Sequence, residues 1–114
     1  MQTYSLNKVI LIGHLGGKPE GRYTQTGVST ASFSLATNEA WVDANKQKHE
    51  HTEWHQVVVW NKLADFVTKY LDKGYCVYLE GSIKTRIWSD HNNERKKNTE
   101  IVATQIVLLE KNKM

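Results

Sequence analysis

The stretch that decides the fold is 52-TEWHQVVVWNKLADFVTKYLDKG-74, because the hydrophobic period changes within it. Residues 52–60 are rich in β-branched and aromatic side chains, which is typical of a strand. Asn61 can cap a helix, and apolar residues then recur at spacings of three and four, which predicts an amphipathic helix that Gly74 ends. Residues 75–88 return to a period of two, so a strand is predicted on each side of this helix.

Two more strands are predicted before this stretch and one after it. Residues 7–13 (NKVILIG) form a short apolar run, and residues 29–37 (STASFSLAT) alternate between apolar and polar side chains. Residues 99–109 form the last strand, beyond a polar loop or hairpin tip at residues 89–98. This order predicts an all-β, five-stranded OB-fold barrel with one α-helix between the third and fourth strands. A ferredoxin-like order would need a helix after the first strand, where residues 14–19 (HLGGKP) form a turn.

The composition fits one globular domain. The chain has 114 residues, of which 39% are hydrophobic and 24% charged, and no apolar run approaches the ~20 residues that span a bilayer. We expect an OB-fold domain over residues 1–110 and a short basic end at residues 111–114. The single cysteine, Cys76, lies in an apolar run and is expected to be a packing residue in a reducing compartment. Residues 1–7 lack a signal-peptide pattern, so we expect a cytoplasmic protein.

Four tryptophans are more than a small barrel can bury, so we expect them on the surface. Residues two apart on a strand share a face, so Lys84, Arg86 and Trp88 project together. Cations that attract phosphates beside an indole that stacks on a base suit a nucleic-acid strand. The alternate set is predicted to face the barrel interior: Ile83, Thr85 and Ile87.

The same parity places Trp54 and Trp60 on one face of their strand, about 20 Å apart at ~3.3 Å per residue. Trp41 lies just past the alternating strand, where the chain enters a charged loop. A tryptophan in a strand is more often a core residue than a ligand platform. Here, however, aliphatic residues and phenylalanine already supply the apolar face of each strand, which favours surface tryptophans that stack on a ligand.

Two alternative functions are weighed against nucleic-acid binding, and a histidine cluster raises the first of them. His51, Glu53 and His55 share a strand face, so a metal-dependent enzyme is conceivable. The spacing is not that of the helical HExxH motif, and there is no second ligand set, so this hypothesis is the weakest. The other alternative is an OB protein of the primosome type, which bridges proteins at a replication fork.

With these residues in hand, the chain resembles the bacterial single-stranded DNA-binding protein family over nearly its whole length. The blocks that carry the resemblance lie in order along the chain: 7–13 NKVILIG, 15–16 LG, 19–20 PE, 22–23 RY, 33–37 FSLAT, Trp41, 52–55 TEWH, 61–64 NKLA, 70–74 YLDKG, 77–81 VYLEG, 85–86 TR, Trp88 and 99–102 TEIV. The resemblance implies an OB-fold protomer of a homotetramer. It also implies that the protein coats single-stranded DNA with little sequence preference during replication, recombination and repair, and that it catalyses no reaction.

The resemblance also implies roles for particular residues. Base stacking is implied for the four tryptophans: Trp41, Trp54, Trp60 and Trp88. Phosphate contacts are implied for six cations: Lys8, Arg22, Lys62, Lys73, Lys84 and Arg86. His55 matches a position near the subunit interface, which gives the histidine cluster a role without a metal. No cofactor and no metal are expected.

Two departures of the sequence from the family bear on its function. Gln56 and Ile87 stand where some relatives carry a cation, which would remove two phosphate contacts. Relatives end in an acidic tip that recruits replication and repair proteins, whereas this sequence ends in the basic residues 111–114. We therefore expect the chain to coat DNA without recruiting partners that depend on that tip.

Overall fold

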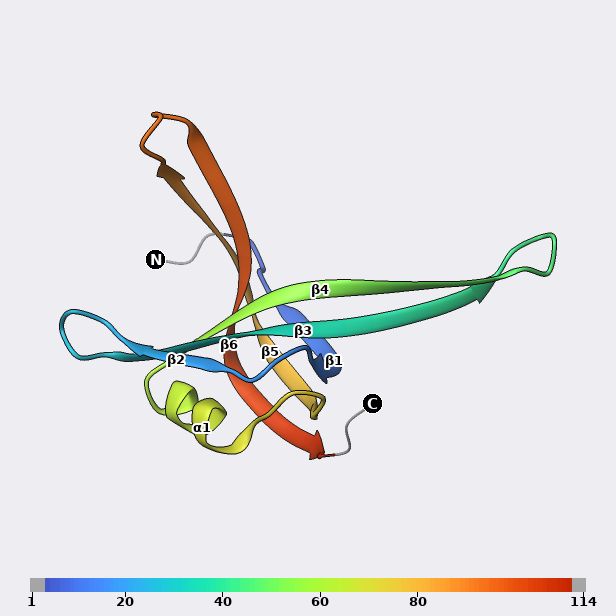
Figure 1. Ribbon diagram of the computed structural model, residues 1–114, viewed down its shortest axis with the longest axis horizontal. Coiled ribbons are helices and arrows are strands. Elements are labelled where there is room, and N and C mark those ends of the chain that lie inside the picture. The colour runs from blue at the N-terminus through green and yellow to red at the C-terminus, as the bar shows by residue number, and fades with distance from the viewer. Residues whose placement is uncertain (1–3, 112–114) are drawn as a thin grey trace.

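The structure is a computed structural model that describes residues 4–111, so residues 112–114 of the predicted basic end lie outside the described part. Six strands and one helix follow one another along the chain (Figure 1): β1 (Val9–Leu15), β2 (Glu20–Tyr23), β3 (Ser29–Val42), β4 (Lys48–Trp60), α1 (Lys62–Tyr70), β5 (Cys76–Ser89) and β6 (Arg95–Glu110). No helix in the described part is long and apolar enough to cross a membrane.

The strands form a sheet in the order β1-β5-β6-β4-β3-β2, and a second pairing between β1 and β3 closes it. The closing pairs are His14 with Ala36 and Leu15 with Leu35. All neighbouring strands are antiparallel except β4 and β6, which run parallel. This architecture confirms the predicted all-β OB-fold barrel with one helix.

The helix lies between β4 and β5, because β2 adds a strand that the sequence did not predict. The four residues of β2 are all exposed, and the strand pairs with β3 at the margin of the sheet. Without β2, the five strands that close the barrel have the predicted order, with the helix after the third. The strand numbers therefore differ from the prediction, whereas the order of the barrel strands and the helix is as predicted.

Aliphatic side chains from alternate strand positions fill the barrel. On β4, Val57 and Val59 are fully buried, and on β5, Val77 and Leu79 are fully buried. Helix α1 buries Ala64 and Val67 in the same core, so the helix packs against the barrel through one face. These positions follow the period of two in the strands that the sequence predicted.

Two hairpins extend well beyond the barrel (Figure 1), one made of β3 and β4 and the other of β5 and β6. Their pairing continues to Val42–Lys48 in the first hairpin and to Ser89–Arg95 in the second. Because β5 leaves the barrel, Ile83 and Ile87 are 50% and 56% exposed. The prediction that these residues and Thr85 face the barrel interior is therefore wrong, since alternation cannot reveal where a strand leaves its barrel.

Both hairpin tips have the same five-residue loop. In residues 43–47 and 90–94, the first N–H donates to the last carbonyl, and the fourth residue has a positive φ. Asp43 and Asp90, the first residues of these loops, each accept two further backbone N–H groups with their carboxylates. The loops fix the register of the hairpins and hence the neighbours of Trp41 and Trp88.

Candidate nucleic-acid interface

All four tryptophans lie at the surface of the chain, as predicted. The exposed fractions are 49% for Trp41, 59% for Trp54, 37% for Trp60 and 49% for Trp88. Trp54 and Trp60 occupy one face of β4, and the opposite face buries the valines of the core. An exposed indole of this kind is free to stack on a flat ligand.

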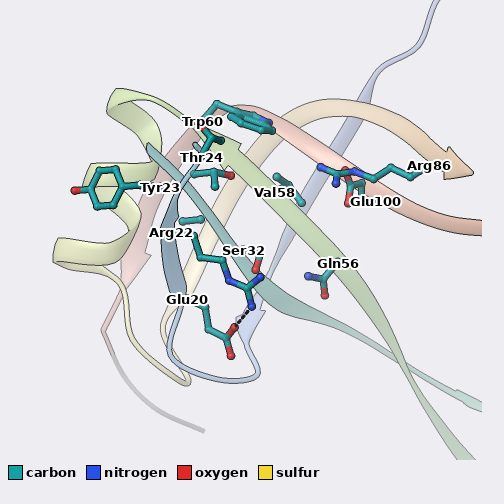
Figure 2. A pocket seen from close by; sticks show the side chains of 12 residues that line it. Glu20, Arg22, Tyr23, Thr24, Ser32, Gln56, Val58, Trp60, Arg86 and Glu100 are labelled. Atoms are coloured by element: carbon teal, nitrogen blue, oxygen red, sulfur yellow. Dashed lines mark hydrogen bonds and ion pairs between the residues drawn. The ribbon is translucent and has the colours of Figure 1, made fainter. Parts of the chain in front are cut away.

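A groove of about 550 Å³ crosses the outer face of β2, β3, β4, β5 and β6 (Figure 2). It brings together three residues for which DNA contacts were predicted, Arg22, Trp60 and Arg86, from strands far apart in the sequence. Gln56 and Val58 form part of its floor between these side chains. The groove therefore combines an indole with two guanidinium groups in one concave surface.

The two arginines of this groove are held by different acids. The Arg22 Nη2 atom lies 3.6 Å from Glu20 Oε2, and both side chains are largely exposed, so this ion pair is weak. Arg86 Nε donates to Glu100 Oε1 at 2.8 Å, and the Glu100 side chain is only 5% exposed. Sequence reasoning missed both acids, because nothing in an alternating pattern indicates that an acid lies within a groove of cations.

A second groove of about 520 Å³ brings Trp54 and Lys73 together, two further predicted site residues. Its lining includes Gly16, over which the Trp54 indole packs closely. A Cβ atom on Gly16 would lie 2.4 Å from Cζ3 of Trp54. The glycine therefore leaves the space that the indole occupies.

Trp88 lies on the hairpin formed by β5 and β6, where cross-strand partners share a face. The register places Trp88 opposite Lys96 and Arg86 opposite Asn98. Lys96 was missed by sequence reasoning, although counting the partners around the 90–94 loop would have found it. Lys84 is exposed on the same face, opposite Glu100. The face predicted for Trp88 and its two cations therefore gains a third cation.

Comparisons with known proteins show which family the chain belongs to. Residues 6–109 match the Single-strand binding protein family. The chain belongs to this family. Single-stranded DNA-binding protein 1 of Chlorobaculum tepidum is 50% identical over 105 residues, which are 91% of this chain and 65% of that relative. The chain thus spans about two thirds of the length of this curated relative.

Two solved structures are also similar to the chain. One is a complex of a Plasmodium falciparum SSB with ssDNA, with a TM-score of 0.86 and 39% identity, covering 96% of this chain and 100% of that one. The other is a deletion mutant of the single-stranded DNA binding protein from Thermus aquaticus, with a TM-score of 0.81 and 31% identity, covering 93% of this chain and 51% of that one.

Trp41 lies apart from the other tryptophans of this family member, near the tip of the β3–β4 hairpin. It pairs with His49, whereas Trp54 pairs with Ala36, and this parity places the two indoles on opposite faces of the hairpin. The His49 ring stacks on the Trp41 ring with centroids 5.5 Å apart and an interplanar angle of 20°. His49 Nε2 lies 2.8 Å from Asp43 Oδ2, and this bond lowers the pKa of the Asp43 carboxyl.

Three of the predicted cations line neither groove that holds a tryptophan: Lys8, Lys62 and Lys84. Lys8 Nζ lies 3.4 Å from Glu80 Oε1, beside the hydroxyl of Tyr78, which donates to Glu80 and lowers the pKa of that carboxyl. Lys62 is exposed at the start of α1, two residues beyond Trp60. The structure thus groups Arg22 with Arg86 in one groove, and places Lys8 beside Glu80, outside both grooves.

The histidines of the candidate metal cluster form hydrogen bonds with different partners. His55 Nε2 lies 2.9 Å from the Thr37 hydroxyl, and the side chain is half-buried. His51 Nε2 lies 3.4 Å from Glu53 Oε2. Within residues 4–111, no three His, Cys, Asp or Glu side chains come together in a way that could hold a metal ion. The metal-enzyme alternative therefore gains no support.

Proposed function

We propose that this chain binds single-stranded DNA with little sequence preference and catalyses no reaction. Bases would stack on the tryptophans: Trp41, Trp54, Trp60 and Trp88. Phosphates would pair with the cations: Lys8, Arg22, Lys62, Lys73, Lys84 and Arg86. The observation that carries the proposal is the groove in which exposed Trp60 lies with Arg22 and Arg86. Every base has a face that can stack, so such a surface tolerates any sequence.

Single strands are favoured over duplex because the bases of a duplex are already stacked on one another. A duplex reader of the helix-turn-helix kind inserts a helix into the major groove. Helix α1 has nine residues and packs Ala64 and Val67 against the barrel. We infer that unpaired strands formed in replication, recombination and repair are the targets, in the bacterial cytoplasm with the nucleoid.

A competition experiment tests this proposal. A labelled oligo(dT) is bound to the protein, and unlabelled competitors are added while fluorescence anisotropy is followed. Single strands of mixed sequence should displace the label at similar concentrations to oligo(dT), with a mild preference for pyrimidines. Duplex of the same length should displace it poorly. Tight binding to one duplex sequence would refute the proposal.

We also propose that the protein is a homotetramer, with His55 near a subunit interface. The outer face of β1, β5 and β6 exposes Ile10, Ile12 and Val107 at 55%, 58% and 43%. The register aligns Ile12, Tyr78 and Val107 in one row across the three strands. Exposed apolar groups gathered on one face are typical of protein interfaces.

The edge of β1 supports the same proposal. Among the described pairings, residues 9–13 of β1 bond only to β5, which leaves one strand edge open for pairing. Sedimentation at micromolar concentration should give four times the protomer mass of 13.1 kDa. A monomer would refute the assembly, and a dimer would favour the primosome-type alternative.

A further inference from the structure

A buried acid lies in the groove that we propose for a polyanion. Within residues 4–111, Glu100 is the only charged side chain that is buried, with 5% exposed. It lines the groove together with Trp60 and Arg86 (Figure 2). Taken alone, a carboxylate there would repel phosphate and carry a desolvation cost, so its presence requires a compensating contact.

That contact is with Arg86 of the neighbouring strand β5. Arg86 Nε donates to Glu100 Oε1 at 2.8 Å, and the arginine side chain itself remains 56% exposed. A hydrogen bond between two ionised groups is among the stronger ones in proteins. The carboxylate is therefore fixed inside the protein while the guanidinium reaches the surface of the groove.

The geometry of the bond leaves most of the guanidinium available. Arginine has five N–H donors, and the bond to Glu100 uses the one on Nε, which leaves four on the two terminal nitrogens. Two terminal nitrogens side by side match two oxygens of one phosphate. A long side chain that is already held in place also loses less conformational entropy when it binds.

We infer that Glu100 is a positioning residue for single-stranded DNA: it holds Arg86 by Nε so that the terminal guanidinium nitrogens meet a phosphate beside Trp60. The inference rests on the proposed function. Glu20 provides the internal contrast, because it lines the same groove but lies 3.6 Å from Arg22 with its side chain 71% exposed. That carboxylate stays hydrated and acts on DNA mainly as a like charge.

Two matched variants separate these roles, since Glu20→Gln and Glu100→Gln each remove one negative charge from the same groove. Affinity for oligo(dT) is measured by anisotropy over a range of salt concentrations. Simple electrostatics predicts tighter binding for both. We expect Glu20→Gln to bind somewhat more tightly at low salt, and Glu100→Gln to bind about 3- to 10-fold more weakly, the range for one well-placed hydrogen bond.

The salt dependence adds a readout that a merely structural role would not change. Glu100→Gln should lose about 0.7 of a unit from the slope of log K against log salt, which corresponds to one single-strand phosphate contact. Binding by Glu100→Gln as tight as wild type, or tighter, would overturn the inference. If the wild-type protein fails to bind oligo(dT) at all, the proposed function has failed instead.

A second variant leaves the buried carboxylate untouched, in case Glu100→Gln does not fold. In Arg86→Lys the charge is kept, but the single ammonium has to serve both Glu100 and the phosphate. We expect this variant to bind about 3- to 10-fold more weakly than wild type, as for one lost hydrogen bond. Wild-type affinity for Arg86→Lys would overturn the inference. The double variant, Glu100→Gln with Arg86→Lys, should lose less affinity than the sum of the two single losses, because residues that act as a unit give non-additive effects. Losses that add up would also overturn the inference.

Discussion

Replacing His49 should weaken DNA binding, because the His49 ring holds the Trp41 indole in place and that indole is proposed to stack on a base. The His49 ring covers one face of the Trp41 indole at a centroid distance of 5.5 Å and bonds to Asp43 at 2.8 Å. Asp43 Oδ1 in turn accepts N–H groups of Asn45 and Gln47, both at 2.9 Å. A chain of contacts thus runs from the loop backbone to the indole, whose other face can take one base.

The magnitude follows from the freedom that His49→Ala would give to the indole. Immobilising a side chain on binding costs about 0.5–1.5 kcal/mol, so binding should weaken by about 2- to 10-fold. This is less than the loss of the whole stacking contact, about 1–3 kcal/mol, expected for Trp41→Ala. His49→Phe keeps a ring against the indole and should retain most of the affinity.

Anisotropy titrations with oligo(dT) compare His49→Ala, His49→Phe and wild type. The hydrogen bond from His49 lowers the pKa of the Asp43 carboxyl from its ordinary value. The stabilisation from this bond is therefore complete above the ordinary pKa and is lost as the pH falls through the lowered pKa. Assays near neutral pH therefore keep Asp43 ionised. The reasoning is refuted if His49→Ala binds like wild type, or if His49→Phe binds as weakly as His49→Ala.

Three further predictions concern affinity, salt dependence and stability. Trp54→Ala and Trp88→Ala should each lose about 1–3 kcal/mol of binding free energy in titrations, with an unchanged fold by circular dichroism. If both variants unfold, the two tryptophans stabilise the core and the prediction is wrong. Lys84→Ala should lower the slope of log K against log salt by about 0.7, and an unchanged slope would exclude a phosphate contact. Gly81→Ala should cost about 1–3 kcal/mol in urea unfolding, because its Cβ would lie 2.2 Å from a β6 carbonyl oxygen. Gly17→Ala, which meets nothing within 4 Å, is the control, and equal stability of the two variants would contradict this prediction.

The core and the strand faces could be predicted from the sequence because burial repeats with the period of the strand. Ala31, Phe33 and Leu35 are buried as the alternation of β3 indicates. Strand β2 escaped prediction because all four of its residues are exposed and it is held by backbone pairing with β3. The exposure of Ile83 and Ile87 also escaped, because local pattern carries no information on where a barrel ends.

The composition of the site was predictable, but its grouping was not. Exposed tryptophans near cations follow from counting and parity within single strands. The meeting of Arg22, Arg86 and Glu100 depends on the order and register of strands that are distant in the sequence. The stack of Trp41 on His49 depends on the loop at residues 43–47, whose five-residue turn sets the hairpin register.

Intrinsic tryptophan fluorescence tests the central claim most directly, because all four indoles are exposed and are proposed to stack on bases. The protein is titrated with poly(dT) at low salt, and duplex DNA of equal nucleotide concentration serves as the control. Stacking predicts strong quenching by poly(dT) that saturates at a fixed number of nucleotides per protomer, with little change on adding duplex. Unquenched fluorescence with poly(dT), or equal quenching by duplex, would contradict the account.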